Sequence, residues 1–357
     1  MYSTEVQNSS TDNDILSTFP EIMNRPTLSV NPNDNLFKIA TFFAIGPSIY
    51  ADGLVVVDRL LNNKKLIKDE NIEKKEKNNE SVLGRIGGKH IILNIISPWL
   101  IEPDSYYPQC LFAKKAVNIM EKITTDQIIG FKTSLNSVLE IFRKTKFAFI
   151  PIVESKNTSG KNNIISHKLR AFITVRDFLK LFTDTQKDNV SKNDKNDDFT
   201  TNIEEIKNIP VKENCSDLII VKEDEFLTSA IDLMLNKGIR NLGITNYESK
   251  LLGVINDRNI IEFLLSRSLR TIAGCNQNVR KKNKSDTRKD SEIINQIRIK
   301  KNLKITPVRQ INENMLIKNA SKLLLDPRNP YLILKGGDRI VTPWDIVMKE
   351  YYLNQMK

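Results

Sequence analysis

The sequence has few of the residues that build disulfide frameworks, metal centres or hydrolase active sites. Its three cysteines, Cys110, Cys215 and Cys275, are an odd number and lie far apart, and its two histidines have no neighbouring ligands at metal-binding spacing. These features indicate neither a disulfide framework nor a zinc site. Sequence order alone leaves a Ser-His-Asp triad open, but no pattern supports one. We therefore expect a protein that is not an enzyme and has no catalytic cofactor or bound metal.

Long hydrophobic runs are also lacking. The longest apolar stretch, residues 91–101, is broken by Asn94, Ser97 and Pro98 and is too short to span a bilayer. The first two dozen residues are rich in Ser, Thr, Asn and Asp, without the basic and apolar blocks of a signal peptide. We expect a soluble, cytoplasmic protein with no membrane contact and a disordered tail over residues 1–24.

The charge is strongly basic, with a formal net charge of +11 at pH 7. Much of the excess lies in polar insertions, and no stretch interleaves aromatic with basic residues as a groove for single-stranded nucleic acid does. A solvated surface therefore explains the charge better than a nucleic-acid partner. The alternative is a nucleic-acid-associated protein that binds through the basic insertions at residues 64–77 and 280–289.

One order of apolar segments recurs four times, at intervals of roughly 90 to 100 residues, as in tandem small domains. In the second copy an apolar run at Ile128-Ile129 precedes a helix with apolar residues at Leu135, Leu139 and Phe142, and two strand-like runs and a further helix follow. A unit of about 60 residues is small for a solitary domain, so each copy needs a neighbour. We predict an α/β (α+β) fold of four tandem β-α-β-β-α repeats.

Composition divides the chain between these repeats. Residues 183–198 contain almost no apolar side chain, so the main boundary is placed there, with two repeats on each side. The predicted segments are repeat one at 25–110 with a polar insertion at 62–81, repeat two at 111–182, a polar linker at 183–202, repeat three at 203–275, a basic insertion at 276–304, and repeat four at 305–357.

Several motifs within the repeats resemble those of the CBS domain, a small regulatory module named after cystathionine β-synthase. They are Glu21-Ile-Met23 and Asn118-Ile-Met120 at the start of a repeat, Ile150-Pro-Ile152 on a middle strand, and the closing run from Gly253 to Ile260. The resemblance implies that repeats one and two, and repeats three and four, pack as two pairs. It also favours an archaeal source.

A Thr-x-x-Asp motif joins the last strand to the last helix in repeats two and four, at Thr174–Asp177 and Thr342–Asp345. In one interpretation the motif only caps a helix, with Thr at its start and Asp in its first turn. In the other, the helix N-terminus and the carboxylate bind the phosphate and the ribose hydroxyls of a nucleotide. Repeats one and three depart from the motif, with His90 and Asn259 in place of the aspartate.

The resemblance implies the nucleotide interpretation and assigns its contacts. Asp177 and Asp345 would bind ribose, and Thr174 and Thr342 the phosphate side. The base would lie against Ile128, Ile129, Phe149, Ile150 and Pro151 in repeat two, and against Thr306 and Tyr331 in repeat four. The implied ligand is AMP, ADP, ATP or S-adenosylmethionine, and the implied role is that of an energy-sensing regulatory protein.

Such a sensor needs a protein partner to read its state, and it would be a monomeric internal disc or a homodimer. The remaining alternative is a ligand-free structural scaffold, in which both motifs only cap helices.

Overall fold

The structure, a computed structural model, describes residues 14–45, 53–60, 79–100, 111–157, 165–183, 198–266 and 292–352. Each repeat consists of a short first strand, a helix, a hairpin of two antiparallel strands and a closing helical segment. The first strand pairs in parallel with the second in repeats one, three and four, and it is reduced to a bridge between Ile129 and Ile152 in repeat two. The predicted β-α-β-β-α order is therefore confirmed.

The elements of the first two repeats are β1 (Ser29–Val30), α2 (Leu36–Ile45), β2 (Leu54–Leu60), β3 (Asn79–Ile86) and α3 (Gly88–Leu100), followed by α5 (Leu135–Thr145), β5 (Phe149–Asn157), β6 (Ile165–Thr174) and η5 (Val175–Phe182). Those of the last two are β8 (Ile220–Lys222), α7 (Leu227–Lys237), β9 (Asn241–Thr245), β10 (Leu251–Asn256) and α8 (Asp257–Leu264), followed by β11 (Gln310–Ile311), α12 (Ile317–Leu325), β12 (Leu332–Leu334), β13 (Arg339–Val341) and η8 (Asp345–Tyr352).

Local sequence explains the best-defined helix boundaries. The hydroxyl of Ser134 caps α5 by accepting from the amide of Ser137, and α5 ends at Lys146 in the left-handed conformation. Helix α7 also ends at a residue in the left-handed conformation: Gly238 has a φ of 64°, which glycine adopts without steric cost. Along α5, the apolar residues predicted to share one face, Leu135, Leu139 and Phe142, are all buried.

A segment precedes the first strand of each repeat, and we call these the lead segments: residues 14–28, 111–128, 198–219 and 292–309. Their regular elements are α1 (Ile15–Thr18), η1 (Pro20–Asn24), η3 (Leu111–Ala113), α4 (Ala116–Ile119), β4 (Glu121–Lys122), η4 (Thr125–Gln127), α6 (Asp198–Lys207), η7 (Val211–Glu213), β7 (Ser216–Asp217) and α11 (Ile299–Asn302).

Each lead segment packs on the neighbouring repeat. β4, which precedes repeat two, extends the sheet of repeat one by pairing with β3. β7, which precedes repeat three, pairs with β13 of repeat four. Thr306, which precedes repeat four, pairs with Val254 in β10, and η1 contacts β6 of repeat two. The exchange links repeat one with two and repeat three with four, as the pairing predicted.

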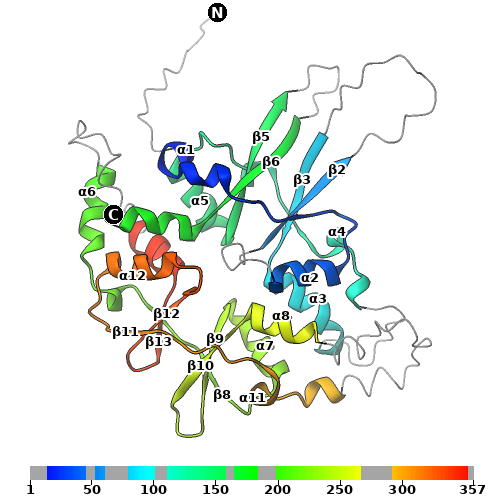
Figure 1. The fold of residues 1–357 in the computed structure, drawn as a ribbon, viewed down its shortest axis with the longest axis vertical. Helices are drawn as coiled ribbons and strands as arrows, with labels where there is room; N and C mark the ends of the chain where they lie inside the picture. The colour runs from blue at the N-terminus through cyan, green and yellow to red at the C-terminus, as the bar shows by residue number, and fades with distance from the viewer. Residues whose placement is uncertain are drawn as a thin grey trace, which may run out of the picture.

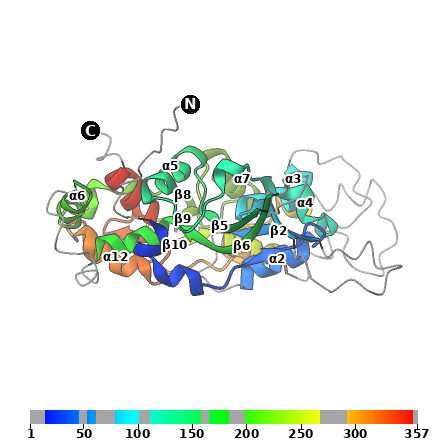
Figure 2. The same cartoon turned by 90° about the horizontal axis from the view of Figure 1, so that it is seen from above.

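Four apolar clusters connect the repeats into a ring. One lies between the sheets of repeats one and two, around Val55 and Phe172, and another between those of repeats three and four, around Leu218 and Tyr331. The two larger clusters join helices across the pairs: α2 and α3 of repeat one pack on α8 of repeat three, and η5 of repeat two packs on α12 of repeat four. Figure 1 shows this ring face on, and Figure 2 shows that the body is flat.

The boundaries of the polar segments differ from the prediction. The disordered tail predicted for residues 1–24 is wrong from residue 14 onward, because Ile15, Phe19 and Ile22 are fully buried against repeat two. Helix α6 begins within the predicted linker, at Asp198, and continues into the predicted third repeat, where Ile206 is buried. Residues 292–304 of the predicted basic insertion supply Ile294, Ile299 and Leu303 to the core. Isolated apolar residues in polar surroundings gave too weak a pattern to predict the packing of residues 14–24.

Residues 1–13, 61–78, 184–197 and 267–291 lie outside the described residues, and with them lie most of the predicted tail, insertions and linker. Across the described ranges, no helix combines the length and the apolarity needed to cross a membrane.

Candidate functional site

All four repeats cap their closing helical segment in the same way. A main-chain amide at the junction between the last strand and the closing segment donates to the side chain three positions later. The acceptors are His90 Nδ1 at 3.0 Å from Gly87 N, Asp177 Oδ2 at 2.8 Å from Thr174 N, Asn259 Oδ1 at 3.0 Å from Asn256 N, and Asp345 Oδ2 at 2.9 Å from Thr342 N. The capping interpretation is thus correct as geometry, and it leaves one carboxylate oxygen in repeats two and four for further contacts.

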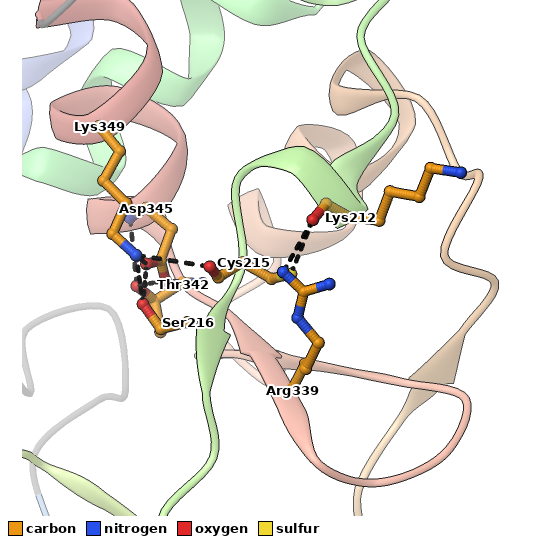
Figure 3. A network of polar contacts seen from close by, with 7 residues as sticks. All are labelled: Lys212, Cys215, Ser216, Arg339, Thr342, Asp345 and Lys349. Carbon is orange, nitrogen blue, oxygen red and sulfur yellow. Dashed lines mark hydrogen bonds and ion pairs between the residues drawn. The ribbon is translucent and has the colours of Figure 1, made fainter.

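In repeat four that second oxygen points to the neighbouring repeat (Figure 3). Asp345 Oδ1 accepts from the hydroxyl of Ser216 at 2.5 Å, and Lys349 Nζ lies 2.9 Å from it. Thr342 Oγ1 donates to the other oxygen at 2.6 Å. Asp345 is 3% exposed, so its polar partners come from the protein itself. The site therefore combines a buried carboxylate at the start of η8, hydroxyl groups from two repeats and a lysine in the last turn of η8.

Of the basic side chains in this network, Lys349 contacts the carboxylate and Arg339 contacts the main chain of Lys212. The Lys349 side chain is 42% exposed and also contacts Ser216, and Arg339 Nη2 donates to the carbonyl of Lys212 at 2.9 Å. Burial raises the pKa of the Cys215 thiol, against a smaller lowering by Arg339. The thiol donates to the Lys212 carbonyl at 3.1 Å and stays protonated, so it is a structural neighbour and not a nucleophile.

In repeat two the equivalent carboxylate is held by an arginine. Arg25 Nη1 donates to Asp177 Oδ2 at 2.9 Å, and Nη2 donates to Oδ1, so the guanidinium binds both oxygens. Thr174 Oγ1 donates to Oδ2 as well, at 2.8 Å. The two charged side chains are only 12% and 5% exposed. The two predicted ribose-binding residues, Asp177 and Asp345, therefore occupy equivalent positions with different partners.

The residues predicted to hold a base in repeat two lie on opposite faces of the sheet. Phe149 and the half-buried Ile128 belong to the cluster between repeats one and two, with Phe149 packed edge-on against Phe172 at 5.9 Å. Ile129 and Ile150 instead belong to the core beneath the helices. Because neighbouring strand residues point to opposite faces, the side chains of these residues do not share one surface, and their contact with a base stays a prediction. Pro151 is buried, and its carbonyl accepts from the Ile129 amide at 3.3 Å.

In repeat four, Tyr331 lies in the cluster between repeats three and four, where burial raises its pKa to about 12. Thr306 is half-buried, and its main-chain amide and carbonyl both pair with Val254 at 3.0 Å. Both residues thus lie at the interface of the pair that contains Asp345. Nucleotide binding by these predicted residues stays a prediction.

In repeats one and three, the residue that caps the closing helical segment is not an aspartate. In repeat one, Glu121 accepts from Arg85 at 2.6 Å and lies 3.4 Å from His90 Nε2. Burial lowers the pKa of Arg85 to about 10 and also lowers the pKa of His90, with Glu121 opposing both shifts. In repeat three, Asn259 has no charge to offer a ligand. Neither junction presents a carboxylate at the capping position, in agreement with the sequence.

Sequence reasoning missed Arg25, Ser216 and Lys349. Lys349 could have been found, because it lies one helical turn after Asp345. The other two come from lead segments and meet their carboxylates only through the exchange between repeats. No group of three His, Cys, Asp or Glu side chains in the described parts of the chain is placed to hold a metal ion. The basic insertions at residues 64–77 and 280–289, considered for nucleic acid, lie outside the described residues.

Comparison with known proteins bears on the family and the fold. A family model described as CBS domain matches residues 206–266. A solved structure from Methanocaldococcus jannaschii, described as a proposed archaeal homologue of γ-AMPK, is 16% identical with a TM-score of 0.61, covering 91% of this chain and 96% of that one. At this identity the similarity shows a shared fold and no more. The search of curated proteins gave no match.

Two further solved structures have lower scores. An uncharacterized conserved protein from Pyrococcus horikoshii is 9% identical with a TM-score of 0.43, covering 91% of this chain and 95% of that one. CBSX2 in complex with AMP, a protein of Arabidopsis thaliana, is 15% identical with a TM-score of 0.29, covering 41% of this chain and 98% of that one.

Proposed function

This chain is a CBS-domain protein with four tandem repeats, and from that premise we propose that it is a non-catalytic sensor of adenosine-containing nucleotides. The proposed site lies between repeats three and four. Its ligand class is AMP, ADP, ATP or S-adenosylmethionine, and a partner protein reads the liganded state. The proposal rests on the residues around Asp345 and on the resemblance of the repeats to CBS domains.

The observation that carries the proposal is the state of the Asp345 carboxylate. One oxygen is fixed by the cap, and the other accepts a hydroxyl from Ser216 at 2.5 Å. A ribose hydroxyl is a donor of the same kind, so it can replace or join that contact without leaving the carboxylate unpaired. A buried carboxylate would otherwise be costly to retain where only a helix cap is needed, since the asparagine of repeat three caps equally well.

The surroundings suit the rest of such a ligand. Lys349 and the amides at the start of η8 supply positive charge for a phosphate group. Tyr331, which is 4% exposed, belongs to the apolar cluster at the same interface, and an adenine ring that enters between the two sheets can stack on its ring. The base and the sugar would thus contact both repeats of the pair, and binding would favour the packing that presents these contacts together.

The test is calorimetric titration of the full chain with AMP, ATP and S-adenosylmethionine. We expect saturable binding to at least one of them, and an affinity at least about tenfold weaker in Asp345→Asn, because charged hydrogen bonds to the ribose are lost. Asparagine keeps the cap, as Asn259 does, so the variant should remain folded.

Asp217→Asn is the matched control, because Asp217 adjoins Ser216 but its side chain is exposed. Its affinity should equal that of the wild type. Absence of binding by the wild-type chain to all three ligands would overturn the proposal and support the scaffold. In that case Asp345→Ala would lower stability by about 1 kcal/mol or less and change nothing else.

A further inference from the structure

We propose that Arg25 occupies the second nucleotide site of this chain, so that the pair of repeats one and two is closed to ligand while the pair of repeats three and four is open. The inference rests on the proposed function. It adds that a single residue of the first lead segment sets how many nucleotides the protein binds.

The register of the sheets identifies the residue that is equivalent to Arg25 in each of the other repeats. In each repeat the first strand pairs with the second at Val30–Val56, Ile129–Ile152, Val221–Ile244 and Ile311–Leu334. Five positions before each first-strand residue the chain has Arg25, Thr124, Ser216 and Thr306. Three repeats thus carry a short hydroxyl side chain at this position, and repeat one alone carries a long cationic one.

This position faces the carboxylate of the neighbouring repeat. Ser216 donates its hydroxyl to Asp345, and Arg25 donates through two nitrogens to Asp177. The two contacts are equivalent in the two pairs, but the donors differ in size and charge. A serine hydroxyl is short and neutral and contacts one carboxylate oxygen, whereas a guanidinium spans both oxygens.

The ion pair between Arg25 and Asp177 is more stable than the contacts that a ribose could make with Asp177. A paired arginine and carboxylate bind through two parallel, charge-assisted hydrogen bonds, and separating them in a buried site leaves a charge uncompensated. A ribose would have to displace Arg25 and then supply two neutral hydroxyls in its place. At Asp345 the competing cation is Lys349, a flexible side chain that is 42% exposed and can turn toward solvent or a phosphate.

Contacts on the side away from Asp177 also fix the position of Arg25. Its guanidinium lies 5.9 Å from the centre of the Phe172 ring, and its amide donates to the carbonyl of Ile22 at 3.1 Å. The preceding residues are anchored by Phe19, which packs edge-on against Phe178 at 5.4 Å, and by an ion pair between Glu21 and Lys180. Opening the site therefore requires moving a segment that is packed on the closing helix of repeat two.

The experiment measures the number of ATP molecules bound per chain by calorimetric titration. The wild type should bind one. Arg25→Ser, which introduces the side chain of repeat three at this position, should bind two, and the additional event should disappear in Arg25→Ser/Asp177→Asn. Asp345→Asn combined with Arg25→Ser should retain only the site in repeat two.

The two proposals fail in different ways. Two ATP molecules on the wild type, or one on a folded Arg25→Ser chain, would overturn the role of Arg25 and leave the sensor intact. No binding of ATP, AMP or S-adenosylmethionine by the wild type or by any of the variants would overturn the sensor itself. If Arg25→Ser does not fold, Arg25→Lys is titrated instead, because lysine keeps the positive charge but lacks the planar guanidinium. A second ATP-binding event in this variant supports the proposal, and its absence overturns the proposal.

Discussion

At the scale of residues, one position in each repeat performs two tasks. His90, Asp177, Asn259 and Asp345 all accept the same main-chain amide, so a titratable ring, an amide and two carboxylates are interchangeable as caps. They are not interchangeable toward a ligand, because only the aspartates have a second carboxylate oxygen that can accept further hydrogen bonds. The sequence predicted a cap at the two Thr-x-x-Asp motifs, but it did not predict that His90 and Asn259 cap in the same way.

His90 makes the stability of repeat one dependent on pH. Its Nδ1 accepts from Gly87 N, so the ring must be neutral, and burial lowers the pKa of His90 below its usual value of 6.5. The folded state then binds fewer protons than the unfolded state. The stabilisation is fully present above pH 6.5 and is lost as the pH falls from there toward the folded-state pKa. We expect the free energy of unfolding to fall between pH 7.5 and pH 5.5.

Denaturant unfolding at the two pH values tests this, with His90→Asn as the comparison. Asparagine keeps the acceptor, as repeat three demonstrates, and does not titrate. The fall in stability should therefore be smaller in the variant than in the wild type. Equal falls would show that Glu121, Arg85, Lys89 or a more distant group causes the pH dependence.

At the scale of elements, two glycines allow the lead segments to approach the hairpins. A Cβ atom on Gly84 would lie 2.6 Å from the carbonyl oxygen of Glu121, and one on Gly253 would lie 2.5 Å from that of Thr306. Both contacts are with main chain, which cannot rotate away as a side chain does. These glycines occur where the exchange between paired repeats brings two backbones together, and the sequence alone gave no reason for them.

Gly253→Ala should therefore lower the free energy of unfolding by about 1–3 kcal/mol, since the fourth lead segment must move away from β10. Gly130→Ala is the matched control: its Cβ would meet only the Val153 carbonyl, at 4.0 Å, and should change stability by less than about 0.5 kcal/mol. Urea denaturation of both variants measures the difference. A Gly253→Ala chain as stable as the control would contradict the close approach.

At the scale of the whole molecule, the ring is closed by contacts of two kinds. Sheets meet within each pair, and helices meet between the pairs, so the helical faces of repeats one and two are covered by repeats three and four. A protein with only one pair of repeats would have to cover those faces with a second copy. In this protein, repeats three and four of the same chain cover those helical faces.

We therefore expect the chain to sediment as a monomer of 40.9 kDa at micromolar concentration. Sedimentation velocity in the presence and absence of ATP measures this mass. A mass twice as large in both conditions would favour the homodimer that the sequence left open. A change on adding ATP would indicate that self-association carries the signal.

The sequence by itself determined the four units and their internal order, because helix periodicity, strand runs and caps depend on residues close together in the chain. It also located the two carboxylates. Only the tertiary structure decided what each carboxylate meets, since Arg25 lies 152 residues from Asp177, and Ser216 lies 129 residues from Asp345. Contacts over such separations depend on which lead segment packs on which repeat, and no local pattern encodes that exchange.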